Sequence, residues 1–297
     1  MNYLAQWSFD PFVILCAGIV LLHERGLARL ARRSRPERTR ARRRRALVFY
    51  AGLALLLLTV TSPIDYWAGD YFFVHMIEHI LIMFFAPILI VAGAPWLPLV
   101  HALPVGLRRR AGRALLLSGW AAPLRALGRL FTNGVVAVAL YNLVMCVWHL
   151  PIAFDAAETD QAIHIWLMHG SFLVSGVLFW LQVIPSYPIR PRLGWPGRIA
   201  AIFVTDCVMF VLAMALSILT AHSWYPVYDH LPGVTLSPFA DQQLGAAILW
   251  VCGDFWALPT FIWAVRRAIE EQGSASALLE HFLRRTPREP LGQAPGA

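Results

Sequence analysis

The sequence predicts an all-α membrane protein, a polytopic bundle of seven transmembrane helices, on the basis of three observations. Hydrophobic residues make up 58% of the 297 residues and charged residues only 14%, whereas soluble domains average about 45–50% and about 25%. The mean hydropathy is +0.58. The apolar residues also fall into runs of about 20 residues, the length that spans a bilayer. Together these features exclude a soluble enzyme, a disordered scaffold and a secreted disulfide-bonded domain.

Seven runs are apolar and long enough for a transmembrane helix. They lie at about residues 10–30, 46–62, 72–92, 133–152, 163–184, 198–220 and 241–265. The segment from about 105 to 130 differs, because arginines surround its short apolar stretch, residues 115–117. This pattern predicts a helix that lies at the cytoplasmic membrane surface. We therefore expect one transmembrane domain over residues 1–270 and a cytoplasmic tail over residues 271–297.

The arginines predict the orientation of these helices. All 25 basic residues are arginine, and the formal net charge is +8. They gather after the first, third and fifth spans and beyond the seventh, whereas the loops 63–71, 153–162 and 221–240 contain no arginine. Because positively charged loops stay in the cytoplasm, the N-terminus is expected outside and the C-terminus inside. Topology thus explains the basic charge without a nucleic-acid partner, and residues 38–45 are also candidates for contact with anionic membrane lipids.

Five histidines are expected at matched depths near the outer ends of the third, fourth and fifth spans. At about 1.5 Å per helical residue, His75, His149 and His164 share a shallow level, and His79 and His169 share a deeper one. His75 and His79 are four residues apart, on one helix face, where two imidazoles can chelate a metal. A single histidine at a membrane interface is commonly no more than a polar surface residue. Five at matched depths favour a metal-binding or proton-handling cluster, because ionisable groups inside a membrane are costly.

Sulfur-containing side chains accompany these histidines. They are Met76, Met145, Cys146 and Met168. Imidazole combined with thioether or thiolate is a donor set for copper, Cu(I) in particular, so copper is the expected cofactor. The ordinary alternative is that methionine and cysteine simply fill space between helices.

Haem is the main alternative ligand, because imidazole also binds haem iron. The pair His79 and His169, or the pair His75 and His149, could hold a haem b between two helices of a membrane redox protein. The sequence contains neither a C-x-x-C-H haem-attachment motif nor a glycine-rich nucleotide loop. It also has no nucleophile–base arrangement that would indicate an enzyme, so the copper hypothesis is favoured.

Four acidic residues of the spans are further candidates. Glu78 lies between the paired histidines but on a neighbouring helix face. Asp241 begins the seventh span, either as an N-cap or as support for a histidine. Asp206 and Asp254 come to nearly the same depth in the inner half of the sixth and seventh spans. They form either a relay for protons or metal, as a metal-free transporter would use, or a hydrogen-bonded pair with one carboxyl protonated.

Short motifs follow one another along the predicted spans. They are His75-Met76-Ile77-Glu78-His79, Ala86-Pro87, Gly93-Ala94-Pro95, Trp148-His149-Leu150-Pro151, His164 and His169 followed by Leu178-Phe179-Trp180, and Asp241-Gln242-Gln243-Leu244-Gly245 followed by Trp250. In this order they resemble the motifs of the multi-spanning CtaG-type cytochrome c oxidase assembly factors of bacteria. The resemblance covers about residues 10–265.

This resemblance implies a non-catalytic role in the maturation of haem–copper oxidases in the bacterial plasma membrane. It implies copper binding at the periplasmic side and delivery to cytochrome c oxidase subunits. A chain without a fused copper-resistance domain is then expected to work with a separate copper chaperone. Glu78 departs from the neutral residue, such as Gln, expected at its position, so it is a candidate proton acceptor as well as a candidate ligand.

Overall fold

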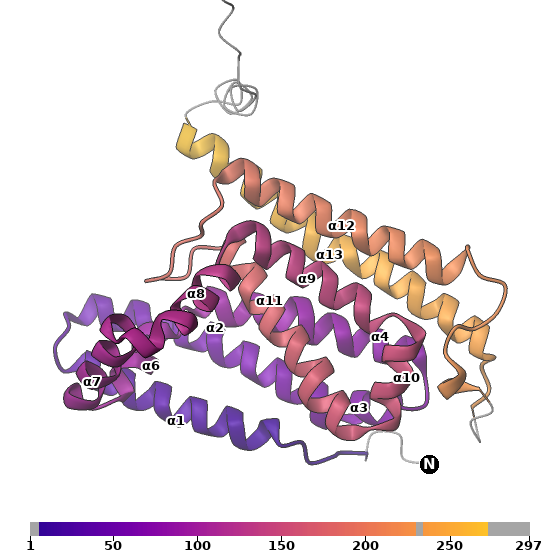
Figure 1. Ribbon diagram of the computed structural model, residues 1–297, viewed down its shortest axis with the longest axis horizontal. Coiled ribbons are helices and arrows are strands. Elements are labelled where there is room, and N and C mark those ends of the chain that lie inside the picture. Colours follow the sequence, from indigo (N-terminus) through magenta and orange to yellow (C-terminus); the bar gives the residue numbers. More distant parts are fainter. Residues whose placement is uncertain (1–5, 230–233, 273–297) are drawn as a thin grey trace, which may run out of the picture.

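Figure 1 shows the computed structural model, which describes residues 6–229 and 234–272. In this part of the chain the regular elements are helices, and one isolated bridge pairs Ser186 with Ile189. The elements are α1 (Phe12–Ala31), α2 (Pro36–Thr61), α3 (Pro63–Ala68), α4 (Phe72–Ile80), η1 (Leu81–Phe85), α5 (Ala86–Gly93), α6 (Trp96–Ala102), α7 (Val105–Leu117), η2 (Gly119–Ala121), α8 (Ala122–Phe131), α9 (Gly134–Trp148), α10 (Pro151–Thr159), η3 (Ile163–His169), α11 (Gly170–Val183), α12 (Trp195–Ser217), η4 (Pro226–Tyr228) and α13 (Pro238–Gln272).

Five helical segments are long and apolar enough to cross a membrane. They are Pro36–Thr61, Phe72–Gly93, Ile163–Val183, Trp195–Ser217 and Pro238–Glu271. A sixth is added if Gly119–Phe131 and Gly134–Trp148, which meet at an angle of 76°, form one bent span. The protein is therefore a multi-pass, all-helical membrane protein with five or six candidate spans. The number seven and the orientation of the termini stay predictions.

Two of the seven apolar runs form helices that fall short of a full span. The first forms α1, which has 20 residues, but Glu24, Arg25 and Arg29 lie in its second half. The fourth forms α9, which has 15 residues. At about 1.5 Å per residue such a helix is roughly 22 Å long, whereas the hydrocarbon core is about 30 Å thick. The charged residues of α1 and the short length of α9 therefore explain why the structure has fewer candidate spans than the seven predicted.

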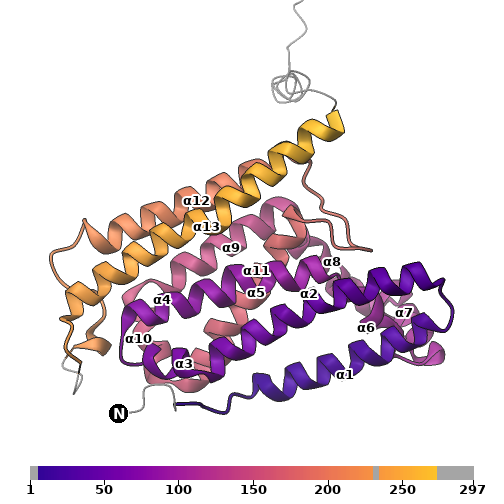
Figure 2. The same cartoon turned by 180° about the vertical axis from the view of Figure 1, so that it is seen from behind.

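The long helices run roughly along the long axis of the molecule and pack side by side (Figure 1). α12 packs against α13, and α1 against α2, as Figure 2 shows from behind; α2 also packs against α5. A Cβ atom on Gly176 of α11 would lie 2.6 Å from the Met83 carbonyl oxygen, and one on Gly245 of α13 would lie 2.5 Å from Cδ1 of Phe72. Because small residues permit close helix approach, α11 and α13 both come close to the segment Phe72–Gly93, which carries His75 and His79.

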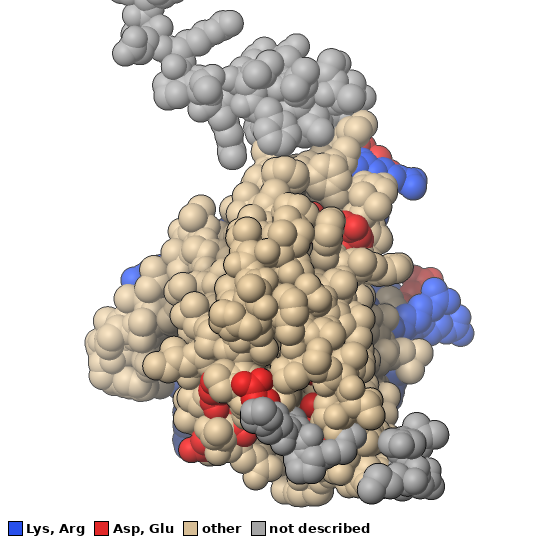
Figure 3. Space-filling model, turned by 90° about the vertical axis from the view of Figure 1, so that its right-hand side faces the viewer, with Lys and Arg blue, Asp and Glu red and all other residues tan. Residues whose placement is uncertain are grey.

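Charged residues separate along this axis. The arginine-rich turn between α1 and α2 lies at one end of the bundle, with α7 and α8, and α3 and α10 lie at the other (Figure 1). Figure 3 looks at the second end, where acidic side chains gather on the lower part of the face and arginines show only toward its margins. We call these the arginine end and the acidic end. Their separation follows the alternation of charge between the loops.

The segment expected at the membrane surface forms α7, η2 and α8. Neither α7 nor α8 buries a residue. The cytoplasmic placement of this segment stays a prediction, and so does the division of the chain into a membrane domain and a tail. Most of that tail, residues 273–297, lies outside the described residues.

Candidate metal centre

Two pairs of histidines face each other at the acidic end of the bundle. On α4, the Nε2 atoms of His75 and His79 are 2.6 Å apart; on η3, those of His164 and His169 are 2.9 Å apart. Residues four apart share a face of an α-helix, but residues five apart diverge by about 140°. η3 is a π-helix, and its i→i+5 hydrogen bonding brings such residues together. Helix geometry therefore creates both pairs locally.

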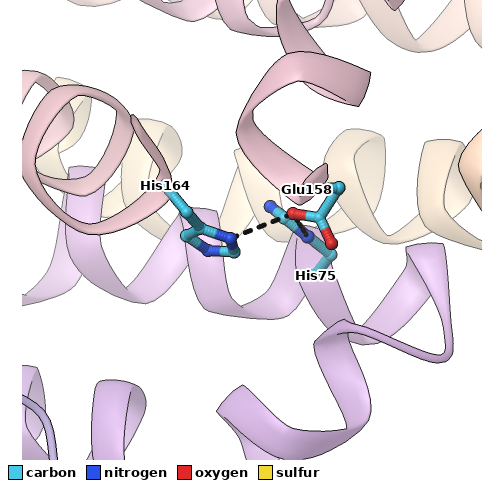
Figure 4. Close-up of side chains that lie close together, drawn as sticks. All are labelled: His75, Glu158 and His164. Atoms are coloured by element: carbon cyan, nitrogen blue, oxygen red, sulfur yellow. Dashed lines mark ion pairs between the residues drawn. The ribbon is translucent and has the colours of Figure 1, made fainter. Parts of the chain in front are cut away.

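A carboxylate from a third element joins the two pairs. Oε1 of Glu158, on α10, is 3.3 Å from Nδ1 of His75 and 3.1 Å from Nδ1 of His164. Figure 4 shows Glu158 between the two rings, with each side chain supplied by a different helix. The three ligand atoms lie within 4.8 Å of one another. Two nitrogens and a carboxylate oxygen in this arrangement could hold a metal ion.

A second such group shares His164 with the first. It consists of Glu78, His164 and His169, with Oε1 of Glu78 at 3.7 Å from Nε2 of His169. His164 turns its Nδ1 toward Glu158 and its Nε2 toward His169. The two groups are therefore continuous through one imidazole ring, and Glu78 belongs to the cluster although it lies on a neighbouring face of α4.

His149 completes the set of five predicted histidines. Its ring centroid lies 5.6 Å from that of His79, and its Nδ1 donates a hydrogen bond of 2.6 Å to the Met145 carbonyl oxygen. This bond leaves Nε2 as the nitrogen with a free lone pair. That Nε2 is buried and has no hydrogen-bond partner, which is the state of a histidine ready to bind a metal.

The interior of the cluster is buried and contains polar atoms without a hydrogen-bond partner in the protein. His75 and Glu78 are 0% exposed, and His79, His149 and His169 are at most 2% exposed. Both carboxylate oxygens of Glu78 and the Nδ1 atoms of His79 and His169 lack hydrogen-bond partners. Buried polar atoms are nearly always paired, and exceptions commonly mark an ion or a water. Nitrogen and carboxylate atoms left unpaired in one place therefore fit a bound cation.

An acidic cavity of about 240 Å³ adjoins the cluster from outside the bundle. Asp10, Asp65, Glu158 and His164 are among its lining residues. Asp65 accepts a hydrogen bond of 2.8 Å from the Ser8 hydroxyl, and burial raises the pKa of its carboxyl. Glu158 and His164 therefore belong both to the wall of this cavity and to the cluster.

Two groups outside the cluster hold it in place. Asp241 of α13 accepts hydrogen bonds from the backbone N–H groups of Phe72 and Phe73, at 2.7 and 2.9 Å, and so caps the N-terminus of α4. The expected N-cap role at the start of the seventh span is wrong, because α13 begins at Pro238 and Asp241 lies within it; Asp241 instead supports the helix that carries His75. The Tyr228 hydroxyl donates to the Ala68 carbonyl oxygen at 2.9 Å and lies 3.2 Å from Nδ1 of His75.

Cys146, the expected thiol ligand, is not part of the two groups of histidine, cysteine and carboxylate atoms that converge. Met76, Met145 and Met168 are buried and Cys146 is half-buried. Met76 packs on α13, with its Cγ atom 3.1 Å from where a Cβ on Gly245 would lie. The two groups that come together contain only imidazole nitrogens and carboxylate oxygens. The role of the sulfur atoms as ligands stays a prediction.

Asp206 and Asp254 lie together, but away from these two groups. They line a cavity of about 140 Å³ between α12 and α13, with Trp250. Asp254 is exposed on the bundle surface and Asp206 is half-buried. Among the described hydrogen bonds and ion pairs, none joins the two carboxyl groups. The relay role of this pair stays untested.

Sequence reasoning missed Glu158 and Tyr228. Glu158 lies in the arginine-free loop 153–162, six residues before His164. An acid that close to a histidine, in a loop at the same expected depth, is a signal that could have found it. Tyr228 lies in a loop 153 residues away from His75 along the chain, and no local pattern connects the two.

Comparison with known proteins agrees with the motif order. A family model described as cytochrome c oxidase caa3 assembly factor (Caa3_CtaG) matches residues 21–271. The uncharacterized protein Mb0105 of Mycobacterium bovis is 29% identical over 257 residues, which cover 83% of this chain and 37% of that protein. The uncharacterized protein ML1998 of Mycobacterium leprae is 26% identical over 215 residues, 69% of this chain and 31% of that protein.

The chain thus spans about a third of the length of the curated relatives that it matches. No solved structure matches it. The family model, by contrast, extends from the middle of α1 almost to the end of α13 and includes every histidine of the cluster. The chain belongs to the family of cytochrome c oxidase caa3 assembly factors.

Proposed function

We propose that this protein binds copper, as cargo, at the histidine–carboxylate cluster and helps deliver it to a subunit of a haem–copper oxidase. The observation that supports the proposal most is the pair of groups His75–Glu158–His164 and Glu78–His164–His169. These side chains come from α4, α10 and η3, and several of their polar atoms are buried without a partner. Such an arrangement is costly to maintain unless a cation binds there.

The chemistry required of the protein is binding and release. Imidazole nitrogen suits copper in either oxidation state, whereas carboxylate oxygen favours Cu(II) over Cu(I). The acidic cavity with Asp10 and Asp65 would attract the ion and lead it to Glu158 and His164. Because the cavity lies at the end of the bundle opposite the arginines, the positive-inside rule places it on the periplasmic side of a bacterial plasma membrane.

The test is metal analysis of the detergent-purified protein after loading with Cu(I) or Cu(II), together with an absorption spectrum. We expect one or two equivalents of copper and no Soret band. His75→Ala combined with His79→Ala should abolish binding, because it removes two of the buried nitrogens. His101→Ala combined with His222→Ala, outside the cluster, serves as the matched control.

Unchanged copper stoichiometry in the His75 and His79 variant would refute the site. A Soret band that disappears in the same variant would instead identify a haem protein. If neither copper nor haem binds, the assembly role of the family must operate through protein contacts, and the histidines must serve another purpose.

A further inference from the structure

A cavity of about 420 Å³ lies at the arginine end, where α1 and α2 meet the turn between α5 and α6. One wall is formed by Arg38, Arg42 and Arg45 of α2. These residues are spaced by four and by three, so their side chains emerge on one face of the helix. Leu97 and the turn at Ala94 contribute to the opposite wall.

Among the described residues, no carboxylate forms an ion pair with the three arginines of this wall. Of the described residues that line the cavity, none is acidic. The Arg42 guanidinium donates to the Ser34 hydroxyl at 2.7 Å, which is a neutral partner. Glu24, the acid that approaches α2 from α1, forms its ion pair with Arg43 at 2.7 Å, and Arg43 does not line the cavity. Three guanidinium groups on one cavity repel each other unless an anion lies between them.

The cavity also has a fixed polar group in its wall. His23 lines it and is only 1% exposed. The Tyr50 hydroxyl donates to Oε1 of Glu24 at 2.7 Å and therefore accepts from Nδ1 of His23, also at 2.7 Å. This chain of bonds holds the imidazole ring in one orientation. The turn opposite contains Ala94 at φ 50°, a left-handed conformation that residues other than glycine rarely adopt, so both walls have a defined shape.

The position of the cavity along α2 identifies the source of the anion. The arginines occupy the charged first part of α2, and the apolar part of the same membrane-spanning helix begins directly after Arg45. Val48 follows Arg45 by three residues, on the same face, and is exposed. A ligand at this boundary would therefore meet guanidinium groups at one end and an exposed apolar helix at the other.

We infer that this cavity binds the phosphate headgroup of an anionic membrane phospholipid, with the acyl chains lying along the apolar part of α2. Guanidinium groups bind phosphate through paired, charge-assisted hydrogen bonds. Basic pockets between transmembrane helices are suited to lipid headgroups. The inference is independent of the metal centre, which lies at the other end of the bundle.

The experiment is native mass spectrometry of the full chain in detergent, titrated with phosphatidylglycerol or with phosphatidylcholine. We expect one phosphatidylglycerol to bind preferentially. Arg38→Gln, Arg42→Gln and Arg45→Gln together should weaken it roughly a hundredfold, or roughly fivefold per arginine. The matched control replaces the same number of exposed arginines of the α1–α2 hairpin that do not line the cavity: Arg32→Gln, Arg33→Gln and Arg40→Gln.

A second variant guards against misfolding. Arg38→Gln with Arg45→Gln leaves the hydrogen bond between Arg42 and Ser34 in place. This double variant should still weaken phosphatidylglycerol binding roughly twentyfold. Equal losses in the two triple variants, or equal affinity for phosphatidylcholine, would overturn the inference. Displacement of the lipid by an equal concentration of inorganic phosphate would overturn the lipid source.

Discussion

The two ends of the bundle carry opposite charge and are built in different ways. At the arginine end, the three arginines of the cavity come from neighbouring turns of one helix, and at least two of them are exposed. At the acidic end, the cluster combines side chains of α4, α9, α10 and η3, and nearly all are buried. The charged groups of the arginine end thus come from a single helix, whereas those of the acidic end are brought together by tertiary packing.

This difference predicts how each end responds to change. An exposed cation keeps its hydration and contributes little binding energy on its own. Lipid affinity at the arginine end should therefore fall gradually as arginines are removed. A buried polar group depends on its neighbours for every interaction. Copper binding at the acidic end should therefore be lost on a single substitution, and substitutions far away in the sequence should also affect it.

Beyond the paired histidines, the largest effect is expected from Glu158. Glu158→Gln keeps the shape of the side chain but removes the negative charge that lies between His75 and His164. Copper affinity should fall roughly ten- to a hundredfold, as when a group that orients metal ligands is lost. Competition with a chelator of known affinity measures this change. Glu37→Gln, on the exposed start of α2, is the control, and equal affinity in both variants would remove Glu158 from the site.

The second-largest effect is expected from lowering the pH, which should weaken copper binding at the acidic end. Imidazole binds copper only when it is unprotonated, and its ordinary pKa is about 6.5. Because burial disfavours the charged imidazolium, copper affinity should stay full down to this range and fall by roughly tenfold or more per pH unit at lower pH. The same chelator competition between pH 8 and pH 4 gives the result. A flat profile over this whole range would mean that histidines do not bind the ion.

Asp241 tests whether the cluster depends on distant capping. Asp241→Asn keeps one acceptor oxygen for the N–H groups of Phe72 and Phe73 and loses the other. We expect a stability loss of about 1 kcal/mol and a few-fold loss of copper affinity, because α4 carries His75 and His79. Thermal unfolding and copper binding are measured together.

Asn133→Ala provides the comparison for Asp241. Asn133 caps α9 through Val135 and Val136, at the helix end opposite His149. It should cost a similar amount of stability with copper affinity unchanged. If both variants change copper affinity alike, the effect of Asp241 is a general one on folding.

The smallest effect is expected from the carboxyl pair of α12 and α13. Asp206→Asn with Asp254→Asn should leave copper stoichiometry and affinity unchanged, because neither residue belongs to the groups that converge on His164. Metal analysis of this variant beside the wild type checks the expectation. A loss of copper would show that the middle of the bundle and its acidic end act together.

Much of the fold could be predicted from the sequence, because hydropathy and charge are local properties. The second, third, fifth, sixth and seventh apolar runs all correspond to helices able to span a membrane. The first run was harder to judge, since Glu24, Arg25 and Arg29 lie within its helix. The bend of 76° before α9 and the π-helical turn of η3 depend on packing, and no sequence period indicates them.

Part of the candidate site could likewise be predicted from the sequence, and part could not. The pair His75 and His79 could be predicted because an α-helix puts residues four apart on one face. Matched depth predicted His149 and His164 at the level of His75, and His169 at the level of His79. In the structure the ring centroids of His164 and His75 are 5.3 Å apart and those of His169 and His79 are 6.5 Å apart, whereas the His149 ring lies 5.6 Å from that of His79. Depth along a helix, however, does not specify which side faces which neighbour, so it could not show that Glu158 lies between two rings.

By itself, then, the sequence determined that this chain is a helical membrane protein, which family it belongs to, and that five of its histidines lie near one end of the bundle. Those properties follow from composition, motif order and the fixed rise of a helix. Only the tertiary structure decided that Glu158 and His164 connect the two histidine pairs, and that Asp241 caps α4 from α13. These contacts join residues that are far apart along the chain, and close packing between helices alone determines which of them meet.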